Sequence, residues 1–407
     1  MAVYLVTGGL GFIGSNFVRE KLKNMSSEDR IIILDKITYA GNPDNLKEYL
    51  NDNIILPKKQ KSWKQISWHI DLTTKSFDVS SIEDETIQKY VLRWSFKLAG
   101  YNYQSVETEK LTTVLEEQLQ NHRLVLIVAG IEDEEVVGRI IPLVDYVVHF
   151  AAETHVDRSI LNPTSFIEHD VFGTYNLLNA FKNSDRLKKF IHISTDEVYG
   201  PAPEGISYKE DTPLAPGNPY SASKVAADRM AYAFYNTYGL PVVIARPSNN
   251  YGPYQYPEKL IPVMIIKALN DEYLPVYGDG RQIRDWLYVK DTAWAIDVLI
   301  EKGKPGEVYN ISGRSERENI YVIRKILKYL GKPESLIKHV KDRPGHDRRY
   351  SINDEKIRDL GWAPTGNLDD YISDVVKWYI DNRWWWEKIL KYDREYTEFM
   401  QRWYRER

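Results

Sequence analysis

The sequence predicts an α/β protein: a doubly wound parallel sheet, a smaller mixed α/β unit toward the C-terminus, and an inserted α/β segment. Three observations support this prediction. Short strand patterns alternate with helical patterns, and a glycine-rich turn joins the first strand to the first helix. Residues 57–123 interrupt this alternation with a lysine-rich loop and mainly helical patterns. The 407 residues are enough for two or three packed units around a large apolar core.

The N-terminal elements indicate a parallel crossover. Residues 3–7 are a short apolar run typical of a buried strand, and residues 12–22 carry apolar side chains at helical spacing. We expect a second buried strand at residues 31–34 and a short helix at residues 42–50, with Pro43 in its first turn. Strand, helix and strand in so short a stretch indicate a right-handed connection between parallel strands.

Residues 57–123 form the insertion, which begins with a lysine-rich loop. A strand is possible at residues 65–72, and helices are expected at residues 82–98 and 106–119. Both helices are amphipathic, and isolated helices of this length are marginal in water. We therefore expect a folded excursion that packs on the edge of the sheet.

The alternation resumes at residue 124. Strands are expected at residues 124–129, 146–150, 190–194 and 242–245, and helices at about 132–141, 163–181 and 221–238. Six or seven parallel strands of this kind make a doubly wound sheet. Proline and glycine become more frequent after Arg246, and the elements shorten. We therefore expect one domain from residues 1–56 and 124–245, the insertion of residues 57–123, and a mainly substrate-binding domain from residues 246–407.

Composition excludes several classes of function. Lys plus Arg is 54 and Asp plus Glu is 58, so the formal net charge is −4 and no bulk positive field favours nucleic acid. The chain has no cysteine, which excludes thiolate catalysis, disulfides and cysteine-bound metals. No apolar run approaches the roughly 18 residues of a membrane span. We expect a cytoplasmic protein with no metal site, no membrane segment and a bound cofactor for any redox step.

The first glycine-rich turn indicates a dinucleotide site. Gly8, Gly11 and Gly14 lie between the first strand and the first helix, where they allow a tight turn and close approach to a pyrophosphate. Asp35 ends the next strand and is placed to accept hydrogen bonds from ribose hydroxyls. An acid at this point favours NAD over NADP, although Lys36 beside it weakens that inference. The alternative is a merely structural glycine turn.

A second pattern, Tyr220 followed by Lys224, indicates hydride chemistry. Residues four apart share one face of a helix, so the Lys224 ammonium is expected to lower the pKa of Tyr220. A tyrosine so tuned takes the proton of an alcohol while nicotinamide takes the hydride. The alternative is an unconnected surface pair.

Asp196 and Glu197 are two adjacent carboxylates at the predicted end of a buried strand, a costly arrangement for a structural role. In an extended strand they would face opposite ways, so both enter one pocket only if the strand breaks at Thr195. An acid and a base side by side suit a dehydration. The alternative role for Asp196 is a loop cap.

Several motifs carry a family resemblance over residues 1–56 and about 124–390. The chain resembles the extended short-chain dehydrogenase/reductases and, within them, the group of dTDP-glucose 4,6-dehydratases. The acid pair separates that group from similar epimerases and decarboxylases. The matching segments are residues 7–15 (TGGLGFIGS), 34–41 (LDKITYAG), 149–159 (HFAAETHVDRS), 194–200 (STDEVYG), 220–224 (YSASK), 246–253 (RPSNNYGP), 281–286 (RQIRDW) and 342–350 (DRPGHDRRY).

The resemblance implies a reaction on a nucleotide-diphosphate sugar with tightly held NAD. Tyr220, Lys224 and Thr195 would serve oxidation at C4, Glu197 would remove the C5 proton, and Asp196 would protonate the C6 hydroxyl as water leaves. The implied cofactor contacts are Gly8, Gly11, Phe12, Ile13, Gly14, Asp35, Lys36, Ile131, Ala151, Tyr220 and Lys224. The implied substrate contacts are Asn249, Lys259, Arg284, Asn319, Arg343, His346 and Tyr350.

Some alternatives stay open. A 4-epimerase of the UDP-glucose type shares Tyr220 and Lys224, a non-catalytic NAD sensor would keep only the fold, and dTDP is not separable from UDP as the nucleotide. Aromatic residues on the helices at 163–181 and 221–238 exceed what one sheet face needs, and the resemblance implies a homodimer through such helices.

The chain departs from the family in two ways. It carries the insertion, which we expect to lie beside the adenine end of the cofactor, take no part in acid–base chemistry and at most modulate NAD retention or contact a partner. It also reads Gly130-Ile131 where the family has an Asp-Ile pair against the adenine; Asp71 is the alternative acid if the insertion follows it.

Overall fold

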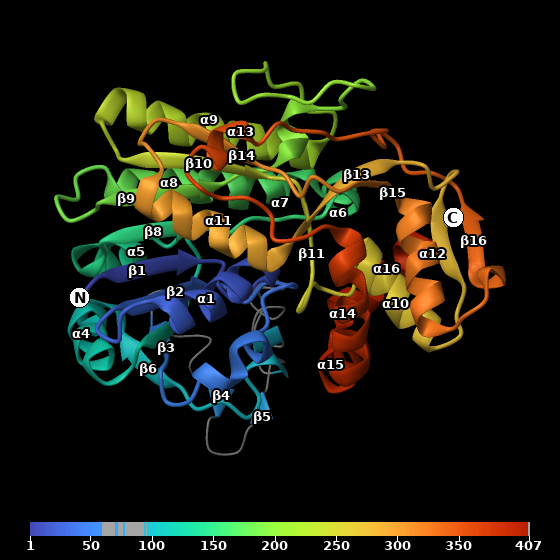
Figure 1. Cartoon of the computed structure of the whole chain (residues 1–407). Coiled ribbons are helices and arrows are strands. Elements are labelled where there is room, and N and C mark those ends of the chain that lie inside the picture. Colours follow the sequence, from blue (N-terminus) through green and yellow to red (C-terminus); the bar gives the residue numbers. More distant parts are fainter. Residues whose placement is uncertain (59–69, 72–75, 78–92, 95, 406–407) are drawn as a thin grey trace.

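The computed structural model describes residues 1–58, 70–71, 76–77, 93–94 and 96–405. Its centre is a nine-stranded sheet in the order β14-β10-β9-β8-β1-β2-β7-β3-β6, with every neighbouring pair parallel (Figure 1). The strands are β1 (Val3–Thr7), β2 (Arg30–Asp35), β3 (Ile54–Lys58), β6 (Gln104–Glu107), β7 (Leu124–Val128), β8 (Tyr146–His149), β9 (Lys189–Ile193), β10 (Val242–Pro247) and β14 (Val308–Ile311). The predicted fold class is confirmed.

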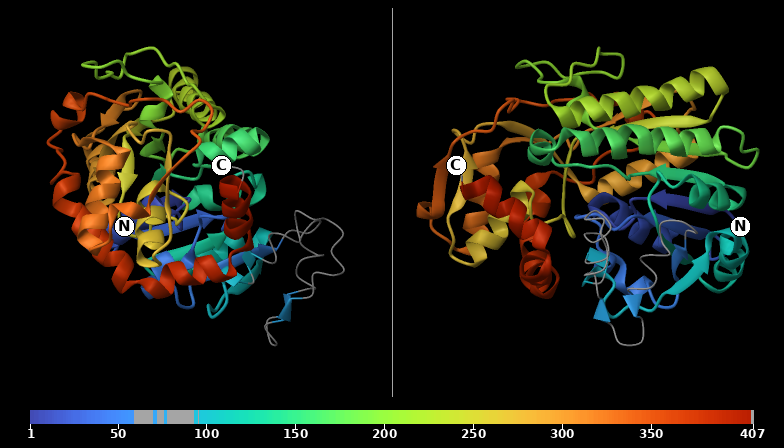
Figure 2. Two further views of the ribbon diagram at one scale, coloured as in Figure 1. Left: turned by 90° about the vertical axis from the view of Figure 1, so that its right-hand side faces the viewer. Right: turned by 180° about the vertical axis from the view of Figure 1, so that it is seen from behind.

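Helices cover both faces of this sheet, which explains why its central strands are buried along their whole length. Leu5 and Val6 show the alternation: their side chains enter different apolar clusters on opposite faces. One face packs against α1 (Phe12–Asn24) and α11 (Val289–Lys302). The other packs against α4 (Leu111–Asn121), α5 (Glu134–Ile140), α8 (Gly173–Phe181) and α9 (Pro219–Tyr238) (Figure 2).

The insertion extends the sheet beyond β7 with two strands, β3 and β6, that the sequence reading missed. Residues 106–107 end β6, so the predicted helix 106–119 is wrong at its start; a 3-10 turn, Thr108–Lys110, and then α4 follow. Val106 is the buried residue of β6, too little apolar pattern to reveal a strand. Most of the predicted elements at 65–72 and 82–98 lies outside the described residues. Within the described part, β4 (Ile70–Asp71) pairs with β5 (Ser76–Phe77).

A second apolar core lies in the C-terminal part of the chain, beside the sheet (Figure 1). Its strands are β11 (Asn249–Tyr251), β12 (Leu274–Tyr277), β13 (Ile283–Tyr288), β15 (Glu316–Glu318) and β16 (Ile337–Val340). Its helices are α10 (Leu260–Leu269), α12 (Asn319–Leu330), α14 (Leu368–Asp381), α15 (Arg383–Tyr392) and α16 (Arg394–Arg405). Because β14 returns to the large sheet, residues after 246 serve both cores, and the domain limits stay a prediction.

Short elements complete the connections. They are α6 (Val156–Leu161), α7 (Pro163–Phe166), a π-helical turn (Ile167–Phe172) leading into α8, α13 (Glu355–Arg358), and 3-10 turns at Pro43–Tyr49, Ile141–Leu143, Asp196–Tyr199 and Glu334–Leu336. The predicted helices at residues 42–50 and 163–181 thus form as a 3-10 turn and as an interrupted helix.

A buried ion pair joins α9 to β10 and supplies a stability prediction. Asp228 and Arg246 are 0% and 1% exposed and share two hydrogen bonds of 2.9 Å. The Asp228→Ala change leaves the Arg246 guanidinium buried without its anion, so we expect a loss of about 3–5 kcal/mol in urea unfolding. Arg229→Ala, which removes a half-exposed cation from the same carboxylate, should cost less than about 1 kcal/mol.

The same pair predicts a pH dependence. Burial acts to raise the pKa of Asp228, but Arg246 lowers this pKa to about 2, below the roughly 3.9 of an unfolded aspartate. A depressed folded pKa gives stability that is present above about pH 4 and is lost as the pH falls toward 2. The Asp228→Ala protein should lack this part of the acid transition; equal acid curves for both proteins would contradict the assignment.

Candidate active site

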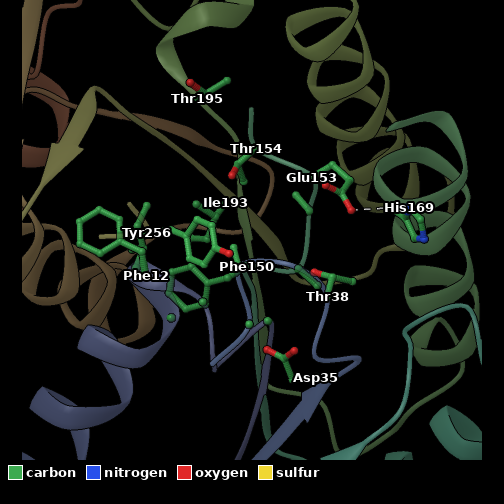
Figure 3. Close-up of a pocket in the computed structure, with 18 of the residues that line it drawn as sticks. Phe12, Asp35, Thr38, Phe150, Glu153, Thr154, His169, Ile193, Thr195 and Tyr256 are labelled. Atoms are coloured by element: carbon green, nitrogen blue, oxygen red, sulfur yellow. Dashed lines mark ion pairs between the residues drawn. The ribbon is translucent and has the colours of Figure 1, made fainter. Parts of the chain in front are cut away.

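The main pocket lies at the carboxyl ends of the strands, where β1 has β2 on one side and β8 on the other. Figure 3 shows Asp35 and Thr38 toward one end and Thr195 at the other. Every residue predicted to contact the cofactor lines this pocket: Gly8, Gly11, Phe12, Ile13, Gly14, Asp35, Lys36, Ile131, Ala151, Tyr220 and Lys224.

The glycine turn is required by close packing. Gly8 has φ of +67°, and a Cβ there would lie 2.7 Å from the backbone nitrogen of Ala151. A Cβ on Gly14 would collide with the carbonyl oxygen of Gly8. Gly11 caps α1 without a side-chain hydrogen bond, and the first turn of α1 has no acid. The positive end of the helix is therefore available to an anion such as a diphosphate.

Asp35 is held rigidly beside this turn. Its two oxygens accept hydrogen bonds from the backbone N–H groups of Leu10, at 2.9 Å, and Ile37, at 2.8 Å. Burial raises the pKa of Asp35. A fixed carboxylate one strand away from the glycine turn fits a ribose of a dinucleotide, and together the turn, the helix and this acid fit NAD.

An ion pair occupies the end of the pocket near Asp35. The ammonium of Lys36 bonds the carboxylate of Glu132 and lies 3.3 Å from Nε2 of His169. Burial acts to raise the pKa of Glu132, but Lys36 lowers it overall. A side chain on Gly130 would collide with this carboxylate, so Glu132 fills the space that an acid at position 130 would need.

Asp71 does not take the place of the missing family acid. The strand beside β2 is β7, so the adjoining loop is residues 129–133, whereas Asp71 belongs to the separate two-stranded β4–β5 sheet. The alternative offered by the sequence is wrong because the insertion precedes β7 and therefore carries Asp71 away from the loop after it.

The acid pair lies where the strand stops. β9 ends at Ile193, and Thr195 caps the following 3-10 turn, accepting a hydrogen bond of 3.3 Å from the Glu197 N–H. The two carboxylates are thus released from the alternation of a strand. Glu197 lines the pocket, whereas Asp196 lies behind Thr195, whose hydroxyl donates to Asp196 Oδ1 at 3.2 Å.

Burial favours the neutral form of Asp196. Desolvation, with added repulsion from Glu197 and Asp285, raises the pKa of Asp196 well above its usual value. Its Oδ2 atom is buried and has no hydrogen-bond partner within the described part of the chain, as suits a protonated acid able to donate. Glu197 instead accepts a hydrogen bond of 3.4 Å from the Tyr350 hydroxyl. The two acids therefore have different environments.

Tyr220 and Lys224 lie in the first part of α9, which Asn218 begins with a reciprocal capping box to Ser221. The predicted effect of Lys224 on Tyr220 is wrong for the protein alone. Burial and nearby carboxylates, Glu197 first, raise the pKa of Tyr220. The Lys224 ammonium donates instead to the carbonyl of Ile193 at 2.7 Å, because its long side chain reaches the end of β9.

The predicted substrate residues divide into three groups. Asn249 and Lys259 line the pocket. Tyr350 bonds Glu197, and the Arg284 guanidinium lies 4.4 Å from its ring centre, so both adjoin the acid pair. Of the remaining three, Arg343 pairs with Asp157 and is also within electrostatic range of Glu197, His346 bonds Asp342, and Asn319 begins α12.

Sequence reasoning missed a pair of carboxylates inside the pocket wall. Asp170 accepts hydrogen bonds from the Ser223 hydroxyl and the Glu153 N–H, both at 2.7 Å. Burial raises the pKa of Asp170 to about 6 and that of Glu153 to about 8. Glu153 lies inside a motif quoted above, but nothing in the sequence marks Asp170, which the interrupted helix before α8 brings there.

Known proteins are similar to this chain in sequence and fold. A model of the family described as GDP-mannose 4,6 dehydratase matches residues 91–375. The dTDP-glucose 4,6-dehydratase of Xanthomonas campestris pv. campestris is 41% identical, with 96% of each chain covered. A crystal structure of dTDP-glucose 4,6-dehydratase from Streptomyces venezuelae with NAD and TYD bound has a TM-score of 0.75, at 36% identity, covering 95% of this chain and 99% of that one.

The UDP-glucuronic acid 4-epimerase of Bacillus cereus, in complex with UDP-glucuronic acid and NAD, is more distant: its TM-score is 0.68 at 25% identity, covering 93% of this chain and 99% of that one.

The glycine turn and the Tyr220–Lys224 helix define an extended short-chain dehydrogenase/reductase. Within that class, the chain belongs to the dTDP-glucose 4,6-dehydratase family.

Among the described residues, no helix has the length and apolar character needed to cross a membrane. In the same part of the chain, no group of three or more His, Cys, Asp and Glu side chains is arranged to hold a metal ion.

The ion pair near Asp35 predicts how the cofactor is selected. While Glu132 neutralises Lys36, that ammonium does not serve a 2′-phosphate. In the Glu132→Gln protein it is released, so we expect NADP to bind about tenfold more tightly, equivalent to about 1.4 kcal/mol, with NAD affinity nearly unchanged. Titration of dinucleotide-depleted protein by intrinsic fluorescence measures both affinities.

The matched control is Glu134→Gln, which removes an exposed acid from the first turn of α5 and should change neither affinity. Adding Lys36→Ala to Glu132→Gln should abolish the gain. An unchanged ratio of NADP to NAD affinity in the Glu132→Gln protein would contradict the prediction, because it would show that Glu132 does not keep Lys36 from binding a 2′-phosphate.

Proposed function

We propose that the protein is an NAD-dependent hydro-lyase that converts dTDP-glucose to dTDP-4-keto-6-deoxyglucose. The observation that carries this proposal is the pair Asp196 and Glu197, one buried and neutral and the other facing the pocket beside Tyr220. Family membership supports it, because the relatives described above bear that activity in their names. An epimerase would have no use for both acids.

The first stage is oxidation at C4 of the glucosyl unit. A bound NAD would supply the hydride chemistry, as acceptor at C4 and donor at C6. Tyr220 takes the proton of the C4 hydroxyl, and Thr195, which hydrogen-bonds Tyr220, would contact the C4 oxygen. Burial holds the pKa of Tyr220 high in the protein alone, so this step needs a nearby positive charge. The Lys224 ammonium, which bonds the Ile193 carbonyl in the protein alone, lies on the same helix face and would supply that charge once substrate and cofactor are bound.

The second stage is elimination. The C4 ketone acidifies the C5 proton, which Glu197 removes, while Asp196 gives its proton to the C6 hydroxyl so that water leaves. Hydride return to C6 and a proton at C5 then complete the 4-keto-6-deoxy sugar. Asn249 and Lys259, which line the pocket, and Arg284, which lies against Tyr350, would bind the nucleotide diphosphate, since cations and amides suit phosphate oxygens.

The direct test follows the mass of the product. With dTDP-glucose we expect loss of one water, detected by mass spectrometry, and slower turnover with UDP-glucose. Conversion to an epimer of unchanged mass would replace the proposal with the epimerase alternative. Absence of any conversion with NAD bound would favour the sensor alternative.

Variants divide the steps. Tyr220→Phe should prevent C4 oxidation, so no reduced nicotinamide forms on mixing with substrate. Glu197→Gln and Asp196→Asn should still form it but lower product formation by about 10²-fold or more, because these acids act only after the ketone exists. Stopped-flow absorbance of the reduced nicotinamide measures the first step. Equal loss of that signal in all three proteins would refute this division of roles.

We further propose a homodimer through α8 and α9. These helices pack together, and a row of large side chains on and before them is exposed, including Phe172 at 62%, Tyr238 at 54% and Tyr175 at 43%. Sedimentation at micromolar concentration should give a dimer, and Phe172→Glu with Tyr175→Glu should give a monomer. Tyr329→Glu on α12, equally exposed, is the control. A wild-type monomer would refute the proposal.

A cytoplasmic location stays a prediction.

A further inference from the structure

The insertion contacts the wall of the cofactor pocket directly. The Lys97 side chain is 3% exposed, and its ammonium donates hydrogen bonds to the carbonyls of Thr38, Tyr39 and Gly41 at 2.9, 2.6 and 2.9 Å. The indole N–H of Trp94 donates to the carbonyl of Lys36 at 3.0 Å. Two insertion residues thus hold four carbonyls of the segment 36–41, which we call the cofactor loop.

The cofactor loop follows Asp35 and lines the pocket through Lys36, Thr38, Tyr39, Ala40 and Gly41. Its Ile37 has φ of +51°, a left-handed conformation that is strained for a β-branched residue. A strained loop keeps one conformation only if its surroundings restrain it. Asp35 restrains it from one side, through the Ile37 N–H, and Lys97 restrains it from the other, with all three of its donors used.

Lys97 also joins the loop to the C-terminal segment. Its ammonium lies 3.7 Å from Asp393, a carboxylate 7% exposed that also accepts a hydrogen bond from Tyr256, a residue of the pocket wall. The other charged groups that act on Lys97 are Arg93 beside it, Glu395 at the start of α16 and Asp35 on β2. Burial, the largest influence, lowers the pKa of Lys97 to about 8.

We propose that Lys97 is a positioning residue of the NAD site: through the cofactor loop it fixes the pocket wall around the dinucleotide and slows its release. This inference rests on the proposed NAD-dependent function but not on the sugar chemistry. Lys97 has no contact with the acid pair, so its role concerns cofactor retention. The insertion is therefore part of the cofactor site, reached through the backbone of another segment.

The test is the rate of NAD release from the Lys97→Met protein, followed by intrinsic fluorescence without any sugar nucleotide. We expect release to be at least about tenfold faster, equivalent to about 1.4 kcal/mol. With excess NAD, the kcat for sugar turnover should return to the wild-type value. Lys110→Met, which removes an exposed lysine of the insertion, is the matched control and should release NAD at the wild-type rate.

A pH series separates positioning from general destabilisation. Because the folded pKa of Lys97 is about 8, its charge and one donor are lost as the pH rises through that value, so wild-type NAD release should accelerate there. The Lys97→Met protein should release NAD rapidly at every pH tested. In Asp393→Asn, which removes an anion that raises the pKa of Lys97, the acceleration should begin at lower pH.

Three outcomes would overturn the proposal: a wild-type release rate in Lys97→Met, a wild-type rate that does not change across pH 8, or a loss of turnover that excess NAD does not restore. Circular dichroism of each variant identifies failure to fold, and the wild-type pH series needs no variant. Because release is measured without a sugar, a failed dehydration assay leaves this test intact.

Discussion

The close approach of the first turn to the strand beside it is the constraint on which the pocket depends. Gly8 packs against the backbone at Ala151, just after β8, so residue 8 has no room for a Cβ. This contact brings the N-terminus of α1 to the middle of the sheet edge, between Asp35 on one side and the end of β9 on the other. The functional side chains follow neighbouring parallel strands, whose carboxyl ends meet at one edge of the sheet. Their positions around the pocket therefore depend on this contact.

Burial then sets the charge of each acid in the pocket. Glu153, Asp170 and Asp196 all have a raised pKa because the pocket walls exclude water from them. Asp196 also faces Glu197, and two adjacent anions repel. The break of the strand at Thr195 is what lets one acid be buried and the other face the pocket. A continued strand would have placed them on opposite faces, and the acid and base would not serve one substrate.

The sequence predicts those parts of the fold that depend on local pattern. Six expected strands correspond to β1, β2, β7, β8, β9 and β10, since buried parallel strands read as apolar runs. The sequence pattern did not reveal the two strands beyond β7, because β3 contains Pro57 and β6 buries little. In the site, motifs located Tyr220 and Glu197, but not the contact of Lys224 with Ile193, because side-chain reach depends on tertiary distances that spacing does not encode.

The position of the insertion explains how it reaches the cofactor without disturbing catalysis. It joins the open edge of the sheet, where β3 extends β7, and an edge accepts added strands without disrupting existing pairs. Between that edge and β9 lie β7, β2, β1 and β8, so the acid pair is shielded from changes in the insertion. The cofactor loop leaves β2, next to β7, and comes within reach of Lys97. An insertion here therefore contacts the pocket at its Asp35 end, which would separate cofactor retention from the proton transfers around Thr195.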